Sequence, residues 1–378
     1  MEEQYLTNCG LVLEDRVLDD SAVSVGGGRL IEIGGPLREG FREVDLGGAL
    51  VFPGFIDIHC HGADGVDVNS ADANGLNKAS QFLARHGVTG WVPTLVPDSD
   101  EMYASAVSAI EASIRAGEGA RVLGVHYEGL YANSHRCGAL RTEHFRTYPE
   151  RTFEDLPVPE RGAKLMTMAP ECGNGVLLTR DLVSEGWIVS IGHTEAEVDV
   201  LEKAFEAGAR HVTHLFNAMS GLHHRDLGVA GWALTRKGVS FDLIADGHHI
   251  TPPMVRMAIV ARGIDDAVLI SDSMALAGLG DGEFELWGKQ VSVSDGTART
   301  PAGTISGSVI TMLDAVNLCL SLGFEPWEVS KMASANPAGL LGLTQTGSIR
   351  EGKSADLVAV KNGSAVLTLV GGRIVFEA

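Results

Sequence analysis

The chain has 378 residues, of which 45% are hydrophobic and 21% charged, and this composition excludes a disordered or collagen-like protein. Its 29 Lys and Arg against 49 Asp and Glu give a formal net charge of −20, which disfavours nucleic acid and anionic membrane surfaces as partners. The five cysteines form no CxxC pair, and neither a secretory signal nor an apolar run of ~18 residues is visible. We therefore expect a soluble, cytoplasmic protein.

Both ends of the chain consist of short apolar runs separated by glycine, without a helical period. Examples are SAVSVGGGRLIEIGG near the start and SAVLTLVGGRIVFEA at the end. Each end is too short to bury a core alone. We therefore predict one small β-sandwich-like domain made of residues 1–52 and 345–378, separate from a larger domain over residues 53–344.

The segment 53–344 alternates strand-like runs with helical patterns. The helical patterns include residues 74–85, 101–117, 195–207 and 252–262. Eight strand candidates lie at 54–61, 87–96, 121–129, 163–171, 187–194, 211–217, 239–249 and 267–274. Eight β units joined by crossovers predict an α/β fold, a (β/α)8 TIM barrel. A doubly wound sheet is the competing fold, but it would not need eight such units.

Polar side chains stand at the C-terminal ends of seven of the eight strand candidates. Because these strand ends meet at one rim of a TIM barrel, where active sites are built, we expect the side chains to converge. They are His59, His61, Glu128, Glu171, His193, His214, Asn217, His248, His249 and Asp272.

His59 and His61 lie two positions apart on a strand, so their imidazoles share a face while Cys60 turns away. Two such imidazoles can bind a divalent metal, although the pair alone is a weak signal. The competing interpretation is a barrel rim without catalysis, but several buried histidines and a carboxylate without a metal would be costly. We predict one or two divalent ions per chain, Zn²⁺ first and Fe, Mn or Co as alternatives. Further ligands are expected at later strand ends, from Glu128, His193, His214 and Asp272.

Several motifs resemble those of the N-acetylglucosamine-6-phosphate deacetylases, a branch of the amidohydrolase superfamily. They are PGFIDIHCHG, HYEGLYANSHRCGAL, IGHTEAE, HLFNAMSGLHHRDLG, IADGHHI, LISDSMALAG and SANPAGLLGL. The resemblance implies a (β/α)8 barrel that hydrolyses an acetamide, with Asp272 as catalytic acid and base and His249 polarising the amide carbonyl. It implies metal ligation by Glu128, His193 and His214, with His59 and His61 at a second ion. The sugar phosphate contacts implied are Ala139, Leu140, Asn217, Ala218, Arg225, His249, Ile305 and Gly307.

One departure from the family pattern concerns the substrate. The family motif ends in Ala-His, whereas this chain has Ala139-Leu140, so one polar sugar contact is replaced. The expected reaction converts N-acetylglucosamine 6-phosphate to glucosamine 6-phosphate and acetate. The alternatives are another N-acyl amino sugar, phosphorylated or not, a cyclic amide, or a barrel that has lost catalysis and only binds. The expected partners are the small-molecule amino sugar phosphate and a second copy of the chain, since dimers are the commonest homo-oligomers.

Overall fold

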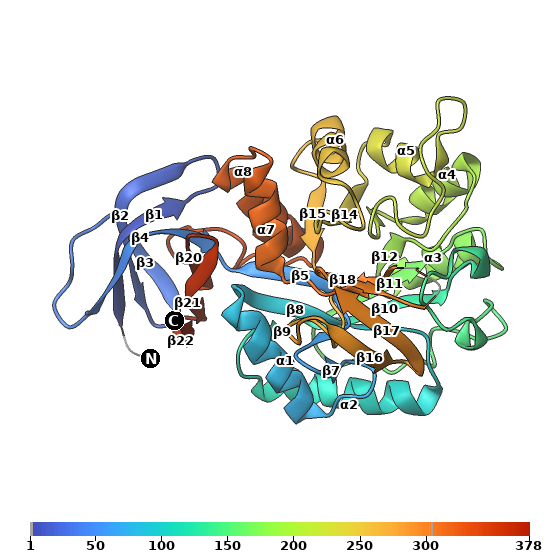
Figure 1. The fold of residues 1–378 in the computed structure, drawn as a ribbon, viewed down its shortest axis with the longest axis horizontal. Coiled ribbons are helices and arrows are strands. Elements are labelled where there is room, and N and C mark those ends of the chain that lie inside the picture. The colour runs from blue at the N-terminus through green and yellow to red at the C-terminus, as the bar shows by residue number, and fades with distance from the viewer. Residues whose placement is uncertain (1–2, 302, 304) are drawn as a thin grey trace.

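The computed structural model describes residues 3–301, 303 and 305–378. It separates into a β domain, at the left of Figure 1, and a barrel surrounded by helices. Within the described ranges, no helix is long and apolar enough to cross a lipid bilayer.

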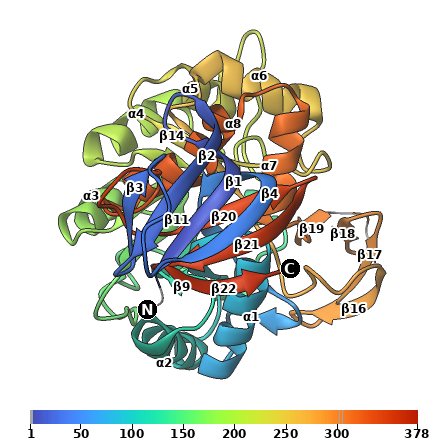
Figure 2. The ribbon, with the colours of Figure 1, turned by 90° about the vertical axis from the view of Figure 1, so that its left-hand side faces the viewer.

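The β domain is one sheet of seven strands that come from both ends of the chain. Its strands, in spatial order, are β22 (Arg373–Glu377), β21 (Ser364–Val370), β20 (Leu357–Lys361), β4 (Arg42–Pro53), β1 (Gln4–Val12), β2 (Val17–Gly26) and β3 (Arg29–Ile33). The antiparallel pairing of β4 with β20 joins the two ends, as Figure 2 shows face on. Apolar side chains from both ends form one buried cluster, among them Leu11, Val25 and Leu369. The predicted small domain from both termini is confirmed, while its boundaries at 52/53 and 344/345 stay a prediction.

The barrel consists of eight parallel strands that follow one another in chain order. They are β5 (Phe55–Cys60), β8 (Val88–Leu95), β10 (Gly124–Tyr131), β11 (Ala163–Met168), β12 (Ile188–Ile191), β13 (His211–Val212), β14 (Ser240–Ile244) and β15 (Ala267–Ile270). A short strand β9 (Arg121–Val122) also pairs with β8. A parallel bridge between Cys60 and Ser273 brings the last strand to the first. Seven of the predicted strand candidates contain one of these strands in full, and the candidate 121–129 overlaps β10, which continues to Tyr131, so the TIM barrel is confirmed.

Helices follow most barrel strands and cover the outside of the barrel (Figure 1). They are α1 (Ala73–Arg85), α2 (Asp100–Ala116), α3 (Gly175–Ser184), α4 (Val198–Ala207), α5 (Gly228–Thr235), α6 (Pro252–Arg262), α7 (Met312–Ser321), α8 (Pro326–Ser330) and α9 (Asn336–Leu340). A π-helical turn (Lys331–Ala335) joins α8 to α9. Between β10 and β11 the chain makes two 3-10 turns, Ser134–Arg136 and Thr142–His144.

Helix α4 begins at Val198, three residues after the predicted start at Glu195. The reason lies in the preceding loop, where the carboxylate of Glu171 accepts hydrogen bonds from the Glu195 N–H (2.8 Å) and the Thr194 hydroxyl (2.5 Å). These bonds hold the Glu195 backbone on the loop, because its N–H is already satisfied outside the helix.

A small antiparallel sheet is inserted between β15 and α7, and it was not predicted from the sequence. Its strands are β16 (Gly282–Leu286), β17 (Lys289–Ser294), β18 (Thr297–Arg299) and β19 (Ile305–Ser308), seen apart from the β domain in Figure 2. Leu286, Val291 and Val293 pack with Met274, just after β15. The Ser308 N–H donates to the Asp272 carbonyl oxygen (2.9 Å), so this sheet adjoins the C-terminal rim of the barrel. A second hairpin, β6 (Gly62–Ala63) and β7 (Val66–Asp67), follows β5.

Candidate metal centre and substrate cavity

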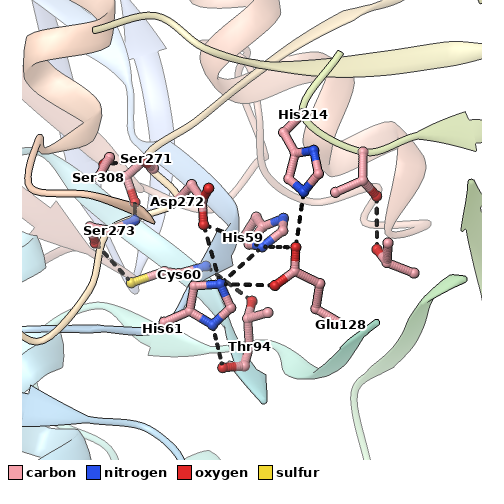
Figure 3. A network of polar contacts seen from close by, with 12 residues as sticks. His59, Cys60, His61, Thr94, Glu128, His214, Ser271, Asp272, Ser273 and Ser308 are labelled. Atoms are coloured by element: carbon pink, nitrogen blue, oxygen red, sulfur yellow. Dashed lines mark hydrogen bonds and ion pairs between the residues drawn. The ribbon is translucent and has the colours of Figure 1, made fainter. Parts of the chain in front are cut away.

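The imidazoles of His59, in β5, and His61, directly after β5, meet a carboxylate from β10, as Figure 3 shows. His59 and His61 place their Nε2 atoms 3.2 Å apart. His59 Nε2 lies 3.3 Å from Glu128 Oε1, and His61 Nε2 lies 3.2 Å from Glu128 Oε2. All three side chains are buried. His59 and His61 therefore point to the same side of the strand, as predicted. Cys60 points away from them, and its sulfur lies 3.3 Å from the Ser273 hydroxyl oxygen.

A second group of three side chains shares the same carboxylate. Glu128 Oε1 lies 3.0 Å from Nε2 of His193 and 3.0 Å from Nε2 of His214. The two imidazole nitrogens are 3.1 Å apart. His193 follows β12 and His214 follows β13, so the ends of three barrel strands, β10, β12 and β13, direct these atoms to one point. Glu128 thus belongs to two groups whose donor atoms could each hold a metal ion.

The donor chemistry of both groups fits a divalent metal. Two ligand atoms that each lie ~2.1 Å from a tetrahedral zinc ion are roughly 3.4 Å apart, close to the separations seen here. Backbone carbonyl oxygens also fix the tautomer of two imidazoles. His61 Nδ1 lies 3.1 Å from the carbonyl oxygen of Thr94, and His193 Nδ1 lies 2.7 Å from the carbonyl oxygen of Arg136. A carbonyl oxygen only accepts, so Nδ1 carries the proton and the Nε2 lone pair faces the other ligands.

The two carboxylates at the site favour positive charge between them. Burial opposes the charged form of His61, but hydrogen bonds with Asp272 and Glu128 outweigh it and raise its pKa to about 10. Burial likewise opposes the charged form of His214, and Glu128 raises that pKa to about 9. An imidazole must be neutral to ligate a metal, so an ion that enters this site displaces protons and supplies the positive charge itself.

Three residues of the site adopt the left-handed backbone conformation. The φ angles are 50° at His193, 33° at His214 and 48° at Asp272. This conformation costs a residue with a Cβ ~1–2 kcal/mol and persists only where the surrounding structure imposes it. Each residue is the second one after the end of a barrel strand, so the turn of the backbone aims its side chain into the rim.

Asp272 stands beside the first group. Its Oδ1 lies 3.2 Å from His61 Nε2 and 3.5 Å from His59 Nε2. Its backbone N–H donates to the His59 carbonyl oxygen (2.9 Å), which ties the end of the last barrel strand to the first. Burial raises the pKa of Asp272, but the charges of His59 and His61 outweigh it and lower the pKa below its ordinary value. Asp272 is therefore ionised and can accept a proton.

A cavity of about 360 Å³ opens onto this group. Asp272, His249 and every predicted metal ligand except His59 line it, together with seven of the predicted sugar contacts: Ala139, Leu140, Asn217, Ala218, His249, Ile305 and Gly307. Arg225 does not line the cavity, because it lies on the exposed loop 221–227 with its guanidinium 2.8 Å from His224 Nε2. Its role as a phosphate ligand stays a prediction.

The sequence analysis missed further lining residues, namely Val96, Gly138, Ile244 and Trp287. Val96 and Ile244 stand at strand ends, where they could have been found by position, but apolar residues give no chemical signal there. Trp287 lies in the inserted sheet, and nothing in its local sequence indicates that it faces the cavity.

Other polar residues of the barrel lie outside the two metal-ligand groups. His126 packs edge-on against His59, with its Nε2 2.8 Å from the Thr167 hydroxyl. Burial and the nearby His59 hold the pKa of His126 well below its usual value, so it is neutral and positions its neighbours. Glu171 holds the loop before α4, as described above, and His248 is exposed outside the cavity lining.

Residues 50–375 match the family model described as the Amidohydrolase family. The chain belongs to the amidohydrolase family. Among curated amidohydrolase relatives, N-acetylglucosamine-6-phosphate deacetylase of Bacillus subtilis is 33% identical, over 99% of this chain and 98% of the relative. N-acetylgalactosamine-6-phosphate deacetylase of Escherichia coli O157:H7 is 35% identical, over 93% and 94%. The crystal structure of N-acetylglucosamine-6-phosphate deacetylase from Pasteurella multocida superposes with a TM-score of 0.91 at 30% identity, covering 98% of this chain and 99% of that one.

Proposed function

We propose that this amidohydrolase removes the acetyl group from N-acetylglucosamine 6-phosphate, giving glucosamine 6-phosphate and acetate. The observation that carries the proposal is the carboxylate of Glu128 shared by two histidine pairs, with Asp272 3.2 Å from His61 at the floor of a cavity. Similarity to the Bacillus subtilis deacetylase along nearly the whole chain supports the choice of an N-acetylated sugar phosphate.

The residues present can hold either one or two divalent ions. Glu128, His193 and His214 would hold one ion, and His59 and His61 with Glu128 a second, with Zn²⁺ as the proposed metal. When bound, such an ion polarises the amide carbonyl and lowers the pKa of an attacking water.

Asp272 moves the protons in the proposed reaction. Its ionised carboxylate accepts a proton from the attacking water and then donates it to the amine nitrogen, because an amide nitrogen leaves poorly unless it is protonated. The fixed position of Asp272, held by backbone hydrogen bonds to His59 and Ser308, keeps its carboxylate beside the reacting atoms.

His249 orients and stabilises the acetyl group. Its Nδ1 lies 2.6 Å from Asp246 Oδ2, so Nδ1 carries a proton and the imidazole is held in one orientation at the cavity wall. We propose that the ring stabilises the negative charge that develops on the carbonyl oxygen during attack. Asn217, Ala218 and Arg225 are the proposed contacts of the sugar phosphate.

Two further statements belong to the same proposal. The protein works in the cytoplasm, and it forms a homodimer. The Escherichia coli relative is named for the epimeric N-acetylgalactosamine 6-phosphate, so the assay includes both hexosamine phosphates.

An acetate-release assay tests the proposal. The purified protein is incubated in zinc-supplemented buffer with N-acetylated hexosamines, each with and without a 6-phosphate. We expect turnover of the phosphorylated sugars and at most weak turnover of the others. Stoichiometric metal with no acetate released from any phosphorylated sugar would refute the proposed function.

A further inference from the structure

A second cavity lies between the β domain and the barrel. Its volume is about 460 Å³, against about 360 Å³ for the substrate cavity. The barrel side contributes Trp327 from α8, which lies beside the β domain in Figure 1. The other side contributes Leu13, just after β1, together with Arg350 and Lys353 from the segment that leads into β20. We call this space the interdomain cavity.

The interdomain cavity lies at the opposite end of the first barrel strand from the metal ligands. Pro53 lines it and precedes β5, whereas His59 and His61 stand at the far end of that strand. The Ser334 hydroxyl, in the π-helical turn, donates to the Pro53 carbonyl oxygen (3.1 Å) and fixes the turn to the start of β5. None of the described residues that line the substrate cavity also lines this one. A ligand bound here would therefore leave the metal centre accessible.

The lining of the interdomain cavity is cationic, although the protein carries a net charge of −20. Among the described lining residues, Lys331, Arg350 and Lys353 are basic and Glu14 is acidic. The described lining of the substrate cavity, by contrast, contains no Lys or Arg. Acidic residues outnumber basic ones by 49 to 29 in the whole chain, so the charge is reversed locally in a way that attracts an anion.

Two of the three cations have no opposite charge beside them. Lys331 forms an ion pair with Asp265, which lies outside the described lining. The Lys353 ammonium donates to the Ser348 hydroxyl (2.7 Å), which is a neutral group. The Arg350 guanidinium makes no hydrogen bond or ion pair with any residue that the structure describes. The positive charges of Lys353 and Arg350 are therefore available to an anionic ligand.

The rest of the lining suits an apolar or ring-shaped group. Leu13, Pro53, Ala338 and Leu343 contribute hydrocarbon, and Trp327 contributes a partly buried ring. The Trp327 indole N–H donates to no other residue in the described ranges, so it can donate to a ligand. The cavity thus offers a ligand both uncompensated cations and apolar surface.

We propose that the interdomain cavity binds a small phosphate monoester with a ring-shaped or hydrocarbon body. Arg350 and Lys353 bind the phosphate, and Trp327 packs against the body. A phosphate monoester carries a charge of about −1.5 to −2 near neutral pH, which matches two uncompensated cations better than a singly charged carboxylate does. The planar guanidinium of Arg350 can also donate two parallel hydrogen bonds to phosphate oxygens. This site does not depend on the proposed reaction.

The first test is calorimetric titration of the metal-loaded wild-type protein with phenyl phosphate, benzoate and inorganic phosphate. We expect phenyl phosphate to have a Kd at least about tenfold lower than either of the others. Benzoate lacks the second charge, and inorganic phosphate lacks the ring that would cover apolar surface. Absence of phenyl phosphate binding, or a Kd for benzoate or inorganic phosphate equal to that of phenyl phosphate, would overturn the proposed ligand class.

The second test locates the site with variants of Arg350. Arg350→Gln should raise the Kd of phenyl phosphate by about tenfold or more, because a charge-assisted hydrogen bond is lost. Arg350→Lys keeps the charge and should raise the Kd less. Arg115→Gln is the matched control, since it removes the same charge from an exposed ion pair with Glu111 on α2. Equal Kd values for Arg350→Gln and Arg115→Gln would place the bound phosphate elsewhere, the metal centre included, and refute the site.

The third test concerns the aromatic side of the cavity. Trp327→Leu removes the ring and the indole N–H, so it should raise the Kd of phenyl phosphate while leaving that of inorganic phosphate near the wild-type value. An unchanged ratio of the two Kd values would exclude Trp327 from the site. Metal content and the melting temperature without added ligand show whether each variant is folded.

Discussion

The Nε2 atom of His193 lies 3.0 Å from Oε1 of Glu128, although the two residues are 65 positions apart. The same oxygen is 3.0 Å from His214, and the other oxygen of this carboxylate is 3.2 Å from His61. One carboxylate therefore connects both groups of histidines. Removing it should disturb the whole centre rather than half of it.

Glu128→Ala should lose bound metal at both positions and lower kcat/KM by more than about 100-fold, because the shared ligand and its charge disappear together. Elemental analysis of the purified variant measures the metal, and acetate release measures the activity. Glu202→Gln is the matched control, since Glu202 binds Trp232 and Arg236 outside the cavity lining. A Glu128→Ala protein with its full metal content would contradict this assignment.

Asp272→Asn should keep its metal but lower kcat by about 10²–10⁴-fold, the range over which a positioned acid or base contributes. An amide side chain preserves the shape of the group but cannot take the proton from water. Metal content and kcat are measured on the same preparation. Asp181→Asn, which affects only a hydrogen bond to Tyr148 on the outside of the barrel, should turn over normally. Near-normal turnover in Asp272→Asn would exclude Asp272 as the proton carrier.

Asp246→Asn should lower kcat by about tenfold to a hundredfold, because His249 loses the carboxylate that orients its ring. The unfolding free energy of the variant should also depend on pH differently from that of the wild type. Burial raises the pKa of Asp246, but hydrogen bonds from the His249 ring and from the backbone N–H groups of His248 and His249 outweigh it and lower the pKa.

A carboxylate with a lowered pKa in the folded protein stabilises the fold at every pH above its unfolded value of ~3.9. This contribution is lost as the pH falls through that value toward the lower folded one. The difference in unfolding free energy between wild type and Asp246→Asn should therefore be constant near neutrality and shrink below about pH 4. Urea denaturation at several pH values measures it, and a difference that does not change with pH would count against an ionised Asp246.

Arg225→Ala tests the phosphate contact implied by the family resemblance. If the guanidinium binds the phosphate, KM for the phosphorylated sugar should rise by about tenfold or more, with little change for the unphosphorylated sugar. Arg16→Ala, on the β domain, removes the same charge far from the cavity and serves as the control. An unchanged KM would assign phosphate recognition to other groups.

Gly124→Ala should destabilise the protein by about 2–4 kcal/mol. A Cβ at this position would lie 2.0 Å from the carbonyl oxygen of Ala163 on the neighbouring strand, so the pairing of β10 with β11 would have to shift. Gly339→Ala is the matched control, because Gly339 lies in α9 with open space around its Cα and alanine favours a helix by about 0.5–1 kcal/mol. Thermal melting should therefore shift in opposite directions for the two variants.

The barrel strands and the convergence of His59, His61, Glu128, His193 and His214 could be predicted from the sequence, whereas the cavity wall was identified less completely. His59 and His61 could be assigned to one face because side chains alternate along a strand. Glu171 and His248 also follow barrel strands and carry side chains that can bind a metal. Glu171 instead accepts hydrogen bonds from the loop before α4, and His248 is exposed. Position at a strand end therefore identifies candidates, and the path of each following loop decides which of them reach the centre.

The amino-acid sequence alone determined the order of the elements, the β domain made from both ends and the common face of the HxH pair. These features follow from side-chain periodicity and turn residues, which act over a few positions. Only the tertiary structure decided that Glu128 is shared, that an inserted hairpin brings Trp287 to the cavity and that Arg225 stands outside its lining. Those relationships are distances between segments far apart in the chain, and they depend on barrel closure and loop packing, which no local pattern encodes.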